Sequence, residues 1–217
     1  MSYKLAIFDM DGTILNTLAD LAASVNFALT AEGYPTRTIE EVRLFVGNGI
    51  RKLIERSVPR GTIVQNIDKV HEKFTAHYTK HCTDNTKPYE GINELLGELR
   101  KNGCKTAVVS NKADYAVQKL CIEYFPEYFD MVAGEQQPIY KKKPAPDLVF
   151  LIMDKLNVAA EDTVYIGDSD VDIQTAVNAK VDCICVDWGF RSREFLLQNG
   201  AEKIVSDTIQ LRQAILQ

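Results

Sequence analysis

The sequence of 217 residues predicts an α/β protein, in which a mostly parallel, Rossmann-like sheet carries helices on both faces and a small helical bundle forms a cap. Three observations predict this fold class. A short apolar run of strand type opens the chain, residues 16–83 show only helical periodicity, and strand and helix patterns alternate from residue 84 onward. We therefore expect a core of residues 1–15 and 84–217, interrupted after its first strand by a cap of residues 16–83.

The first predicted strand, Leu5–Phe8, is a continuous apolar run, typical of a strand that is buried on both faces. It ends in an Asp-Met-Asp-Gly sequence. If the chain is still extended there, Asp9 and Asp11 point to the same side, about 6 to 7 Å apart, and could share one substrate group. Gly12 permits a close approach to a ligand, and Thr13 adds a hydroxyl. A plain solvated turn would also use Asp and Gly, so these residues alone leave both interpretations open.

The predicted cap contains four helices. A first helix follows Thr17, whose spacing from Asp20 resembles a capping box, and a second follows Thr38, whose spacing from Glu41 repeats that pattern. A third is expected from Ile50, after a Gly-Asn-Gly turn, and a long fourth helix fills the rest of the insertion. Four helices without a strand signal are typical of a small bundle.

The predicted core beyond the cap alternates strands with helices. Strands separated by helices imply right-handed crossovers and a mostly parallel sheet. The expected strands are Thr106–Val109, Met131–Ala133, Val164–Ile166, Ile184–Val186 and Ile204–Val205. The expected helices are Ile92–Lys101, Tyr115–Glu123, Leu148–Leu156, Ile173–Asn178, Arg193–Gln198 and Ile209–Leu216.

The composition narrows the classes of function. A formal charge of −5, from 25 basic and 30 acidic residues, argues against nucleic acid and against anionic membrane surfaces as partners. No apolar run approaches the ~20 residues of a membrane span, and the first is too short for a signal peptide, so we expect a cytoplasmic protein. Five cysteines without a CxxC pair indicate reduced core thiols, with Cys183 and Cys185 on one strand face. The other three are Cys82, Cys104 and Cys121.

Two later strand ends also carry polar clusters. Ser110 and Asn111 follow one predicted strand and are suited to holding a phosphate oxygen. Asp168 and Asp172 follow another and lie on one face if a helix begins there. Between them Lys143 precedes a Pro-initiated helix that could fix it toward a site. Because the carboxyl ends of parallel strands meet at one edge, all these groups should lie together with the aspartates of the first strand.

The converging carboxylates predict a metal ion. Two of them about 6.5 Å apart repel by roughly 2 to 3 kcal/mol at an effective dielectric near 20, and up to four converge here. A cation must compensate for this repulsion. Carboxylates without histidine or thiolate favour a hard divalent ion, and Mg²⁺ fits best.

Four sequence motifs carry a family resemblance. DMDGT, SNK, KKPAPD and GDSDVD, in this order and at these separations, resemble the motifs of the haloacid dehalogenase-like superfamily of phosphohydrolases. The insertion is similar to the cap of the subgroup that contains phosphoglycolate phosphatases, β-phosphoglucomutases and pyrophosphatases. GNGIRKL in the insertion and VDWGFR near the end look most like phosphoglycolate phosphatases. One departure is Lys180, at a predicted helix end where the subgroup usually has glycine.

The resemblance implies a role for each matching residue. Asp9 is implied as the nucleophile that forms an aspartyl-phosphate, and Asp11 as the general acid that becomes a general base. Phosphate oxygens would be held by Thr13, Ser110 and Asn111, and Lys143 would offset the charge of nucleophile and phosphoryl group together. Mg²⁺ would be bound by Asp9, the Asp11 carbonyl and Asp168, with Asp172 as a ligand or just behind the ligands.

The implied substrate is a small phosphorylated metabolite, and phosphoglycolate is the favoured one. The protein is expected to be a monomer or a homodimer. Such a substrate carries a carboxylate that the core motifs do not compensate. The turn of Gly47, Asn48 and Gly49, followed by Arg51, could supply backbone N–H groups and a cation when the cap closes. An Arg51 that is merely solvated is equally compatible with the sequence.

Other functions remain open at this stage. A β-phosphoglucomutase-like sugar phosphomutase or a pyrophosphatase would use the same core motifs. A phospho-accepting signalling domain combines similar residues on a parallel sheet, but it needs no cap and is about half this length. A chaperone or regulator that kept the fold and lost turnover would have no reason to retain the complete set of catalytic residues.

Overall fold

The computed structural model describes residues 2–217 of the chain. They form two compact units. The first comprises the residues up to Leu15 together with Pro88–Gln217, and the second comprises Asn16–Lys87. We call them the core unit and the helical unit.

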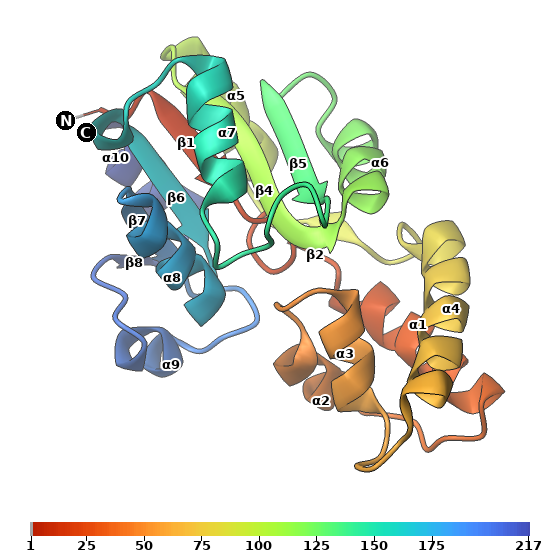
Figure 1. The fold of residues 1–217 in the computed structure, drawn as a ribbon. Helices are drawn as coiled ribbons and strands as arrows, with labels where there is room; N and C mark the ends of the chain where they lie inside the picture. Colours follow the sequence, from red (N-terminus) through yellow and green to blue (C-terminus); the bar gives the residue numbers. More distant parts are fainter. Residues whose placement is uncertain (1) are drawn as a thin grey trace. The chain divides into compact units, whose positions relative to one another are not determined.

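The core unit is built on a six-stranded sheet in which every pairing is parallel, as the sequence predicts (Figure 1). The strands are β1 (Leu5–Phe8), β4 (Lys105–Ala113), β5 (Met131–Glu135), β6 (Thr163–Gly167), β7 (Asp182–Val186) and β8 (Ile204–Val205). Their order is β5-β4-β1-β6-β7-β8, so β1 lies inside the sheet between β4 and β6.

Strand β1 is buried on both faces, and this explains its continuous apolar sequence. All four of its residues have no exposed surface. It pairs along its whole length with both neighbours, and Phe8 lies opposite Val108 of β4 and Ile166 of β6. The residues that follow these three positions therefore emerge together, at what we call the carboxyl edge of the sheet.

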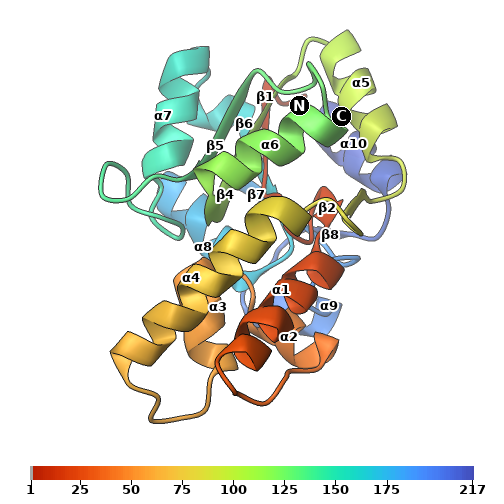
Figure 2. The same ribbon diagram turned by 90° about the vertical axis from the view of Figure 1, so that its right-hand side faces the viewer.

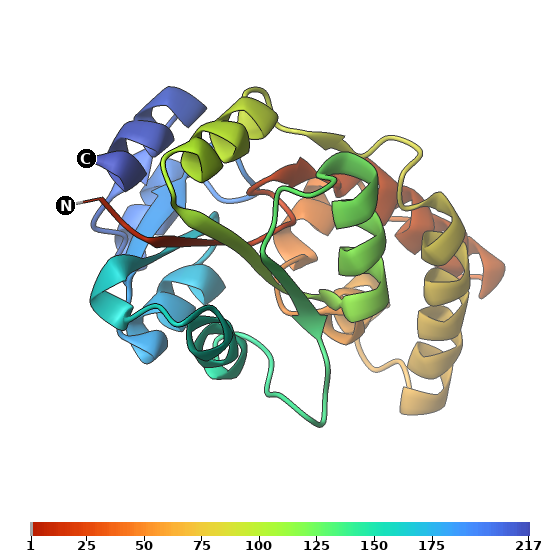
Figure 3. The same cartoon turned by 90° about the horizontal axis from the view of Figure 1, so that it is seen from above.

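Helices cover both faces of the sheet, as predicted. On one face Leu148 and Ile152 of one helix and Ala176 of the next share a core cluster with Leu5 and Ile7 of β1. Figures 2 and 3 show α5 and α10 on the opposite face, where they pack against each other. The core helices are α5 (Ile92–Lys101), α6 (Asp114–Tyr124), α7 (Asp147–Leu156), α8 (Asp170–Ala179), α9 (Arg193–Gln198) and α10 (Thr208–Leu216), with a short 3₁₀ helix at Ala160–Asp162.

The helical unit contains the four predicted helices, of which α1 and α4 pack side by side (Figure 2). The second helix begins with the predicted capping box, because Thr38 Oγ1 accepts from the Glu41 amide and the Glu41 carboxylate accepts from the Thr38 amide. The bounds are α1 (Leu18–Ala31), α2 (Ile39–Phe45), α3 (Ile50–Ser57) and α4 (Val64–His81).

The capping box predicted at Thr17 and Asp20 is absent, since the Thr17 side chain makes no capping bond. The buried Asp20 carboxylate instead accepts from the backbone amides and side chains of Asn85 and Thr86, at 2.8 to 3.0 Å. The Asp20 carboxylate therefore takes part in a long-range hydrogen-bond network and not in a local cap. It also ties Asn85 and Thr86 to the helical unit, which comprises Asn16–Lys87, whereas the sequence predicts a cap of residues 16–83.

Strand β4 is longer than the predicted Thr106–Val109. It includes Ser110 and Asn111 and continues to Ala113, with a register shift against β5 after Val109. The prediction ended where the apolar run ended, because a strand that carries buried polar groups at a site lacks the usual pattern.

Two smaller sequence observations also have a structural counterpart. All five cysteines are free thiols, and Cys183 and Cys185 share a face of β7 with their sulfur atoms 4.0 Å apart. Lys180 ends α8 in the left-handed conformation, with φ 58° and ψ 42°, which explains why glycine is usual there.

Within residues 2–217, no helix is both long and apolar enough to cross a membrane.

Candidate active site

Three carboxylates meet at the carboxyl edge of the core unit. Asp9 follows β1, Asp168 follows β6, and Asp172 lies in the first turn of α8. One oxygen from each lies within 4.8 Å of the other two, and all three residues are buried. Residues that are far apart in sequence are thus brought together by the parallel pairing of β1 with β6.

Lys143 supplies a positive charge to this cluster. Its ammonium nitrogen lies 2.9 Å from Asp9 Oδ1 and 2.7 Å from Asp172 Oδ1, and its side chain is buried. Burial alone would lower the pKa of Lys143, but Asp172 and Asp9 outweigh it and raise that pKa well above its usual range. Lys143 is therefore a fixed cation between two carboxylates.

Asp172 is held by two partners at once. Its Oδ1 faces Lys143, while its Oδ2 accepts from the Ser169 amide at 3.1 Å and from the Ser169 hydroxyl at 2.6 Å. This is the capping box of α8, with Ser169 as the N-cap. No role was predicted for Ser169 from the sequence, although its spacing from Asp172 matches a capping box.

Asp168 is held by donors that carry no charge. Its Oδ2 accepts from the Phe190 amide at 2.6 Å and its Oδ1 from the Thr13 hydroxyl at 3.3 Å. Gly12, with φ 87°, and Gly189 allow this close packing, because a Cβ atom at either position would collide with Asp168. Burial first, then Asp172 and Asp9, raises the pKa of Asp168 well above its usual range.

The cluster suits a divalent cation. The pKa of Asp9 is raised to about 6, first by burial and also by Asp172 and Asp11, while Lys143 opposes the shift. Lys143 pairs with Asp9 and Asp172 but not with Asp168, so three ionised carboxylates would leave negative charge in excess. Oxygen donors without histidine or thiolate are the ligands of hard ions, so Asp9, Asp168 and Asp172 form a group that could bind such a metal.

A second buried ion pair joins Asp11 to Lys112. The lysine nitrogen lies 2.9 Å from Asp11 Oδ1 and 3.0 Å from Asp11 Oδ2, and both side chains are largely buried. Lys112 was not predicted as a site residue. It is the third residue of the SNK motif, in which only the serine and the asparagine were assigned a role.

The predicted phosphate-binding residues lie at the same edge. Ser110 and Asn111 are buried in β4, and Thr13 is buried in the turn after β1. The Asn111 amide group donates to the Lys143 carbonyl at 3.1 Å, which joins the β4 cluster to the loop before α7. Each core residue proposed from sequence is thus located around one edge.

The predicted specificity residues belong to the helical unit. The Arg51 guanidinium pairs with Glu55, at 3.1 Å, and with Asp68. Asn48 accepts from Arg56 at 2.7 Å, and Gly49 caps α3. Arg51 is therefore already engaged by two carboxylates within this unit, and the specificity role of Gly47, Asn48, Gly49 and Arg51 stays a prediction.

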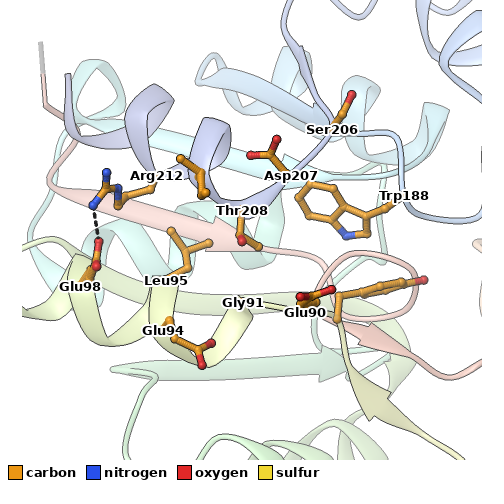
Figure 4. Close-up of a pocket in the computed structure, with 12 residues that line it drawn as sticks. Glu90, Gly91, Glu94, Leu95, Glu98, Trp188, Ser206, Asp207, Thr208 and Arg212 are labelled. Carbon is orange, nitrogen blue, oxygen red and sulfur yellow. Dashed lines mark hydrogen bonds and ion pairs between the residues drawn. The ribbon is translucent and has the colours of Figure 1, made fainter.

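A separate cavity of about 740 Å³ lies in the core unit between α5 and α10 (Figure 4). Four acidic residues line it, including Glu94 and Asp207, and its basic residue, Arg212, is paired with Glu98 at 2.8 Å. This negative lining would repel a phosphate ester. Trp188 forms part of its wall and donates to the Thr13 carbonyl at 3.1 Å, so the cavity adjoins the site but does not contain its carboxylates.

Residues 6–186 match the family of haloacid dehalogenase-like hydrolases. The chain belongs to this family. The matched range includes every residue of the carboxylate cluster and both buried lysines. The resemblance drawn from the four motifs is therefore confirmed.

Relatives of this hydrolase are named phosphoglycolate phosphatases. The protein of that name from Pseudomonas syringae pv. tomato is 30% identical over 216 residues, and the match covers 96% of this chain and 78% of that protein. The one from Psychrobacter arcticus is 31% identical over 217 residues, covering 95% and 93%. A crystal structure from Lactobacillus delbrueckii subsp. bulgaricus, described as a candidate phosphoglycolate phosphatase, has 40% identity and a TM-score of 0.95, over 100% of this chain and 99% of that one.

Proposed function

We propose that this hydrolase is a Mg²⁺-dependent phosphatase that cleaves phosphoglycolate through an aspartyl-phosphate on Asp9. The observation that carries the proposal is the Lys143 ion pair with Asp9 and Asp172, next to a third buried carboxylate at the same edge. This arrangement holds a nucleophile against a fixed cation that can also meet an incoming phosphoryl group. Relatives about as long as this chain that carry the name phosphoglycolate phosphatase support the choice of substrate.

In the first step we assign attack on phosphorus to an Asp9 carboxylate oxygen. The new O–P bond forms while the ester bond between phosphorus and the leaving oxygen breaks. Asp11, which must be protonated when the substrate is bound, passes its proton to that oxygen, so that glycolate leaves as an alcohol. Lys143 offsets the charge that Asp9 and the phosphoryl group bring together.

In the second step water attacks the phosphorus of the aspartyl-phosphate. Asp11, now a carboxylate, accepts the proton of the water as the bond between phosphorus and the Asp9 oxygen breaks. The products are inorganic phosphate and the restored Asp9 carboxylate. During both steps we assign Ser110, Asn111 and Thr13 to the phosphate oxygens, because they are buried polar groups of the same edge. Thr13 takes this role by turning its hydroxyl away from Asp168.

Asp9, Asp168 and the Asp11 carbonyl would hold the Mg²⁺, which offsets phosphoryl charge when it is bound. We place Asp172 behind these ligands, because both of its oxygens already have partners in Lys143 and Ser169. Its role in the proposal is to hold Lys143 against Asp9. The helical unit, residues 16–87, is proposed to serve as the cap.

The test is phosphate release from phosphoglycolate, measured beside a panel of sugar phosphates, glycerol phosphate and pyrophosphate, with Mg²⁺ and with a chelator. We expect phosphoglycolate to have the highest kcat/KM and the chelator to abolish turnover. A higher kcat/KM for a sugar phosphate or for pyrophosphate would replace the proposed substrate. Full activity after chelation would remove the metal from the proposal.

A further inference from the structure

Two lysines, Lys112 and Lys143, appear among the buried charged residues of the described chain. Lys143 is already committed to Asp9 and Asp172, the charges on which the phosphoryl step depends. Lys112 lies on β4 and contacts Asp11 through both carboxylate oxygens. The core unit therefore contains a buried cation beside the proposed acid-base residue, and the phosphoryl step leaves it without a task.

We propose that Lys112 binds the carboxylate on the leaving group of the substrate and so selects phosphate esters of small hydroxy acids. This inference rests on the proposed function, because Asp11 marks the place of the leaving oxygen. It moves the specificity determinant from Arg51 in the helical unit to the carboxyl edge of the core.

Distances support this assignment. Asp11 must come within about 2.6 to 3.2 Å of the leaving oxygen to donate its proton. Because the Lys112 nitrogen lies 2.9 Å and 3.0 Å from the two Asp11 oxygens, it lies within about 6 Å of the leaving oxygen when the substrate is bound. In phosphoglycolate a single carbon separates that oxygen from the carboxylate. The substrate carboxylate therefore falls within reach of Lys112 without a rearrangement of the sheet.

A single lysine can serve two carboxylates at this edge, as Lys143 demonstrates with separations of 2.9 Å and 2.7 Å. An ammonium group has three donors and no fixed fork, so it can join Asp11 and a substrate carboxylate in the same way. A neutral leaving group would place no second anion beside Lys112. The free energy of this contact is thus gained only with an anionic leaving group.

Arg51 is less well suited to the same task. Its guanidinium already contacts Glu55 and Asp68, and Lys52 contacts Glu55 as well, at 2.6 Å. To reach Arg51, a substrate carboxylate would have to displace Glu55 or Asp68, which already contact the guanidinium. The Arg51 side chain is also 37% exposed, so solvent would weaken a new contact between Arg51 and a substrate carboxylate.

The test compares phosphoglycolate with phosphoglycolamide, in which a neutral amide replaces the carboxylate without changing the shape. We expect the wild-type kcat/KM to favour phosphoglycolate by about tenfold or more, as for one charge-assisted contact. Lys112→Met should bring this ratio close to one, while Lys112→Arg, which keeps the charge, should retain a preference. The matched variant Arg51→Met should leave the ratio unchanged.

The ratio is the decisive quantity, because Lys112 also contacts Asp11 and its loss will slow both substrates. Circular dichroism checks the fold, and Lys112→Gln replaces Lys112→Met if the latter does not fold. An unchanged ratio in a folded Lys112 variant, or a ratio that collapses in Arg51→Met instead, would overturn the inference. Failure of the wild-type protein to hydrolyse phosphoglycolate while it cleaves other esters would overturn the proposed function instead.

Discussion

The two buried lysines of the carboxyl edge hold their aspartates in different ways. Lys143 joins Asp9 to Asp172, and Asp172 is itself fixed by Ser169 at the start of α8. Lys112 instead contacts the two oxygens of one carboxylate, Asp11. One lysine is locked between two secondary structure elements, while the other shares an aspartate that must change its protonation state in the proposed reaction.

The difference indicates two separate tasks for two residues of the same type. A cation that is held from several sides is preorganised for charge that develops in every turnover, whatever the leaving group. Lys112 contacts an aspartate that changes its protonation state during the proposed reaction, so it can also respond to the substrate. Loss of Lys143 should therefore affect all substrates alike, and loss of Lys112 should affect them selectively.

The largest expected effect is that of Lys143→Met. We predict that kcat/KM falls by about 10³-fold or more for phosphoglycolate and for p-nitrophenyl phosphate alike, because a full buried charge is lost at the phosphoryl group. Steady-state kinetics on both substrates measures it, with circular dichroism as the check on folding. A loss confined to one substrate would break the contrast between the two lysines.

Asp11→Asn should have the next largest effect, and it should depend on the leaving group. We predict a loss of about 10² or more for phosphoglycolate, within the usual range for general acid-base catalysis. The decrease in the rate of the first step should be smaller for p-nitrophenyl phosphate, because its leaving oxygen needs little protonation. Single-turnover rates of alcohol release separate this step from hydrolysis. An equal loss with both esters counts against Asp11 as the acid.

The pH dependence of metal binding gives a smaller effect. The pKa of Asp9 is raised from 3.8 to about 6, so the folded protein binds more protons than the unfolded chain in that window, and this contribution to stability falls as pH rises through it. Mg²⁺ must displace those protons, so saturating Mg²⁺ should raise Tm by a few degrees more at pH 7 than at pH 5. Asp168→Asn is the control, and an equal shift at both pH values would contradict the prediction.

The smallest expected effect concerns Lys180, at the end of the helix that carries Asp172. Lys180→Gly should stabilise the protein by about 0.5 to 1 kcal/mol, because glycine adopts the left-handed conformation without steric cost. Chemical denaturation measures the change. The variant should leave kcat/KM unchanged, since the site lies at the opposite end of α8. Destabilisation would show that the Lys180 side chain has a role of its own.

The sequence predicted the groups that follow a periodic pattern or sit at a strand end. The run Leu5–Phe8 identified the central strand and therefore the positions of Asp9 and Asp11. Lys143 was predicted near the site because a proline-initiated helix follows it, and it does contact Asp9. These features depend on short stretches of chain, so local patterns suffice to find them.

The features that sequence missed depend on contacts between distant residues. Lys112 and Asp11 are 101 positions apart, and only the pairing of β1 with β4 brings them together. The sequence predicted that Asp20 takes part in a local helix cap. In the structure its carboxylate accepts hydrogen bonds from Asn85 and Thr86 instead. In both cases the partner of a buried charge is distant in sequence and is brought close only by the fold. A local sequence pattern therefore cannot predict it.

The covalent intermediate on Asp9 offers the most direct test of the central claim. Asp11→Asn should still react with p-nitrophenyl phosphate, which needs no acid, but it should hydrolyse the intermediate slowly because it lacks the base. After rapid quenching and proteolysis, we predict that the peptide containing Asp9 carries the added mass of one phosphoryl group, and that Asp9→Asn in the same background abolishes it. Release of p-nitrophenol with the phosphoryl group on another residue, or on none, would contradict the account.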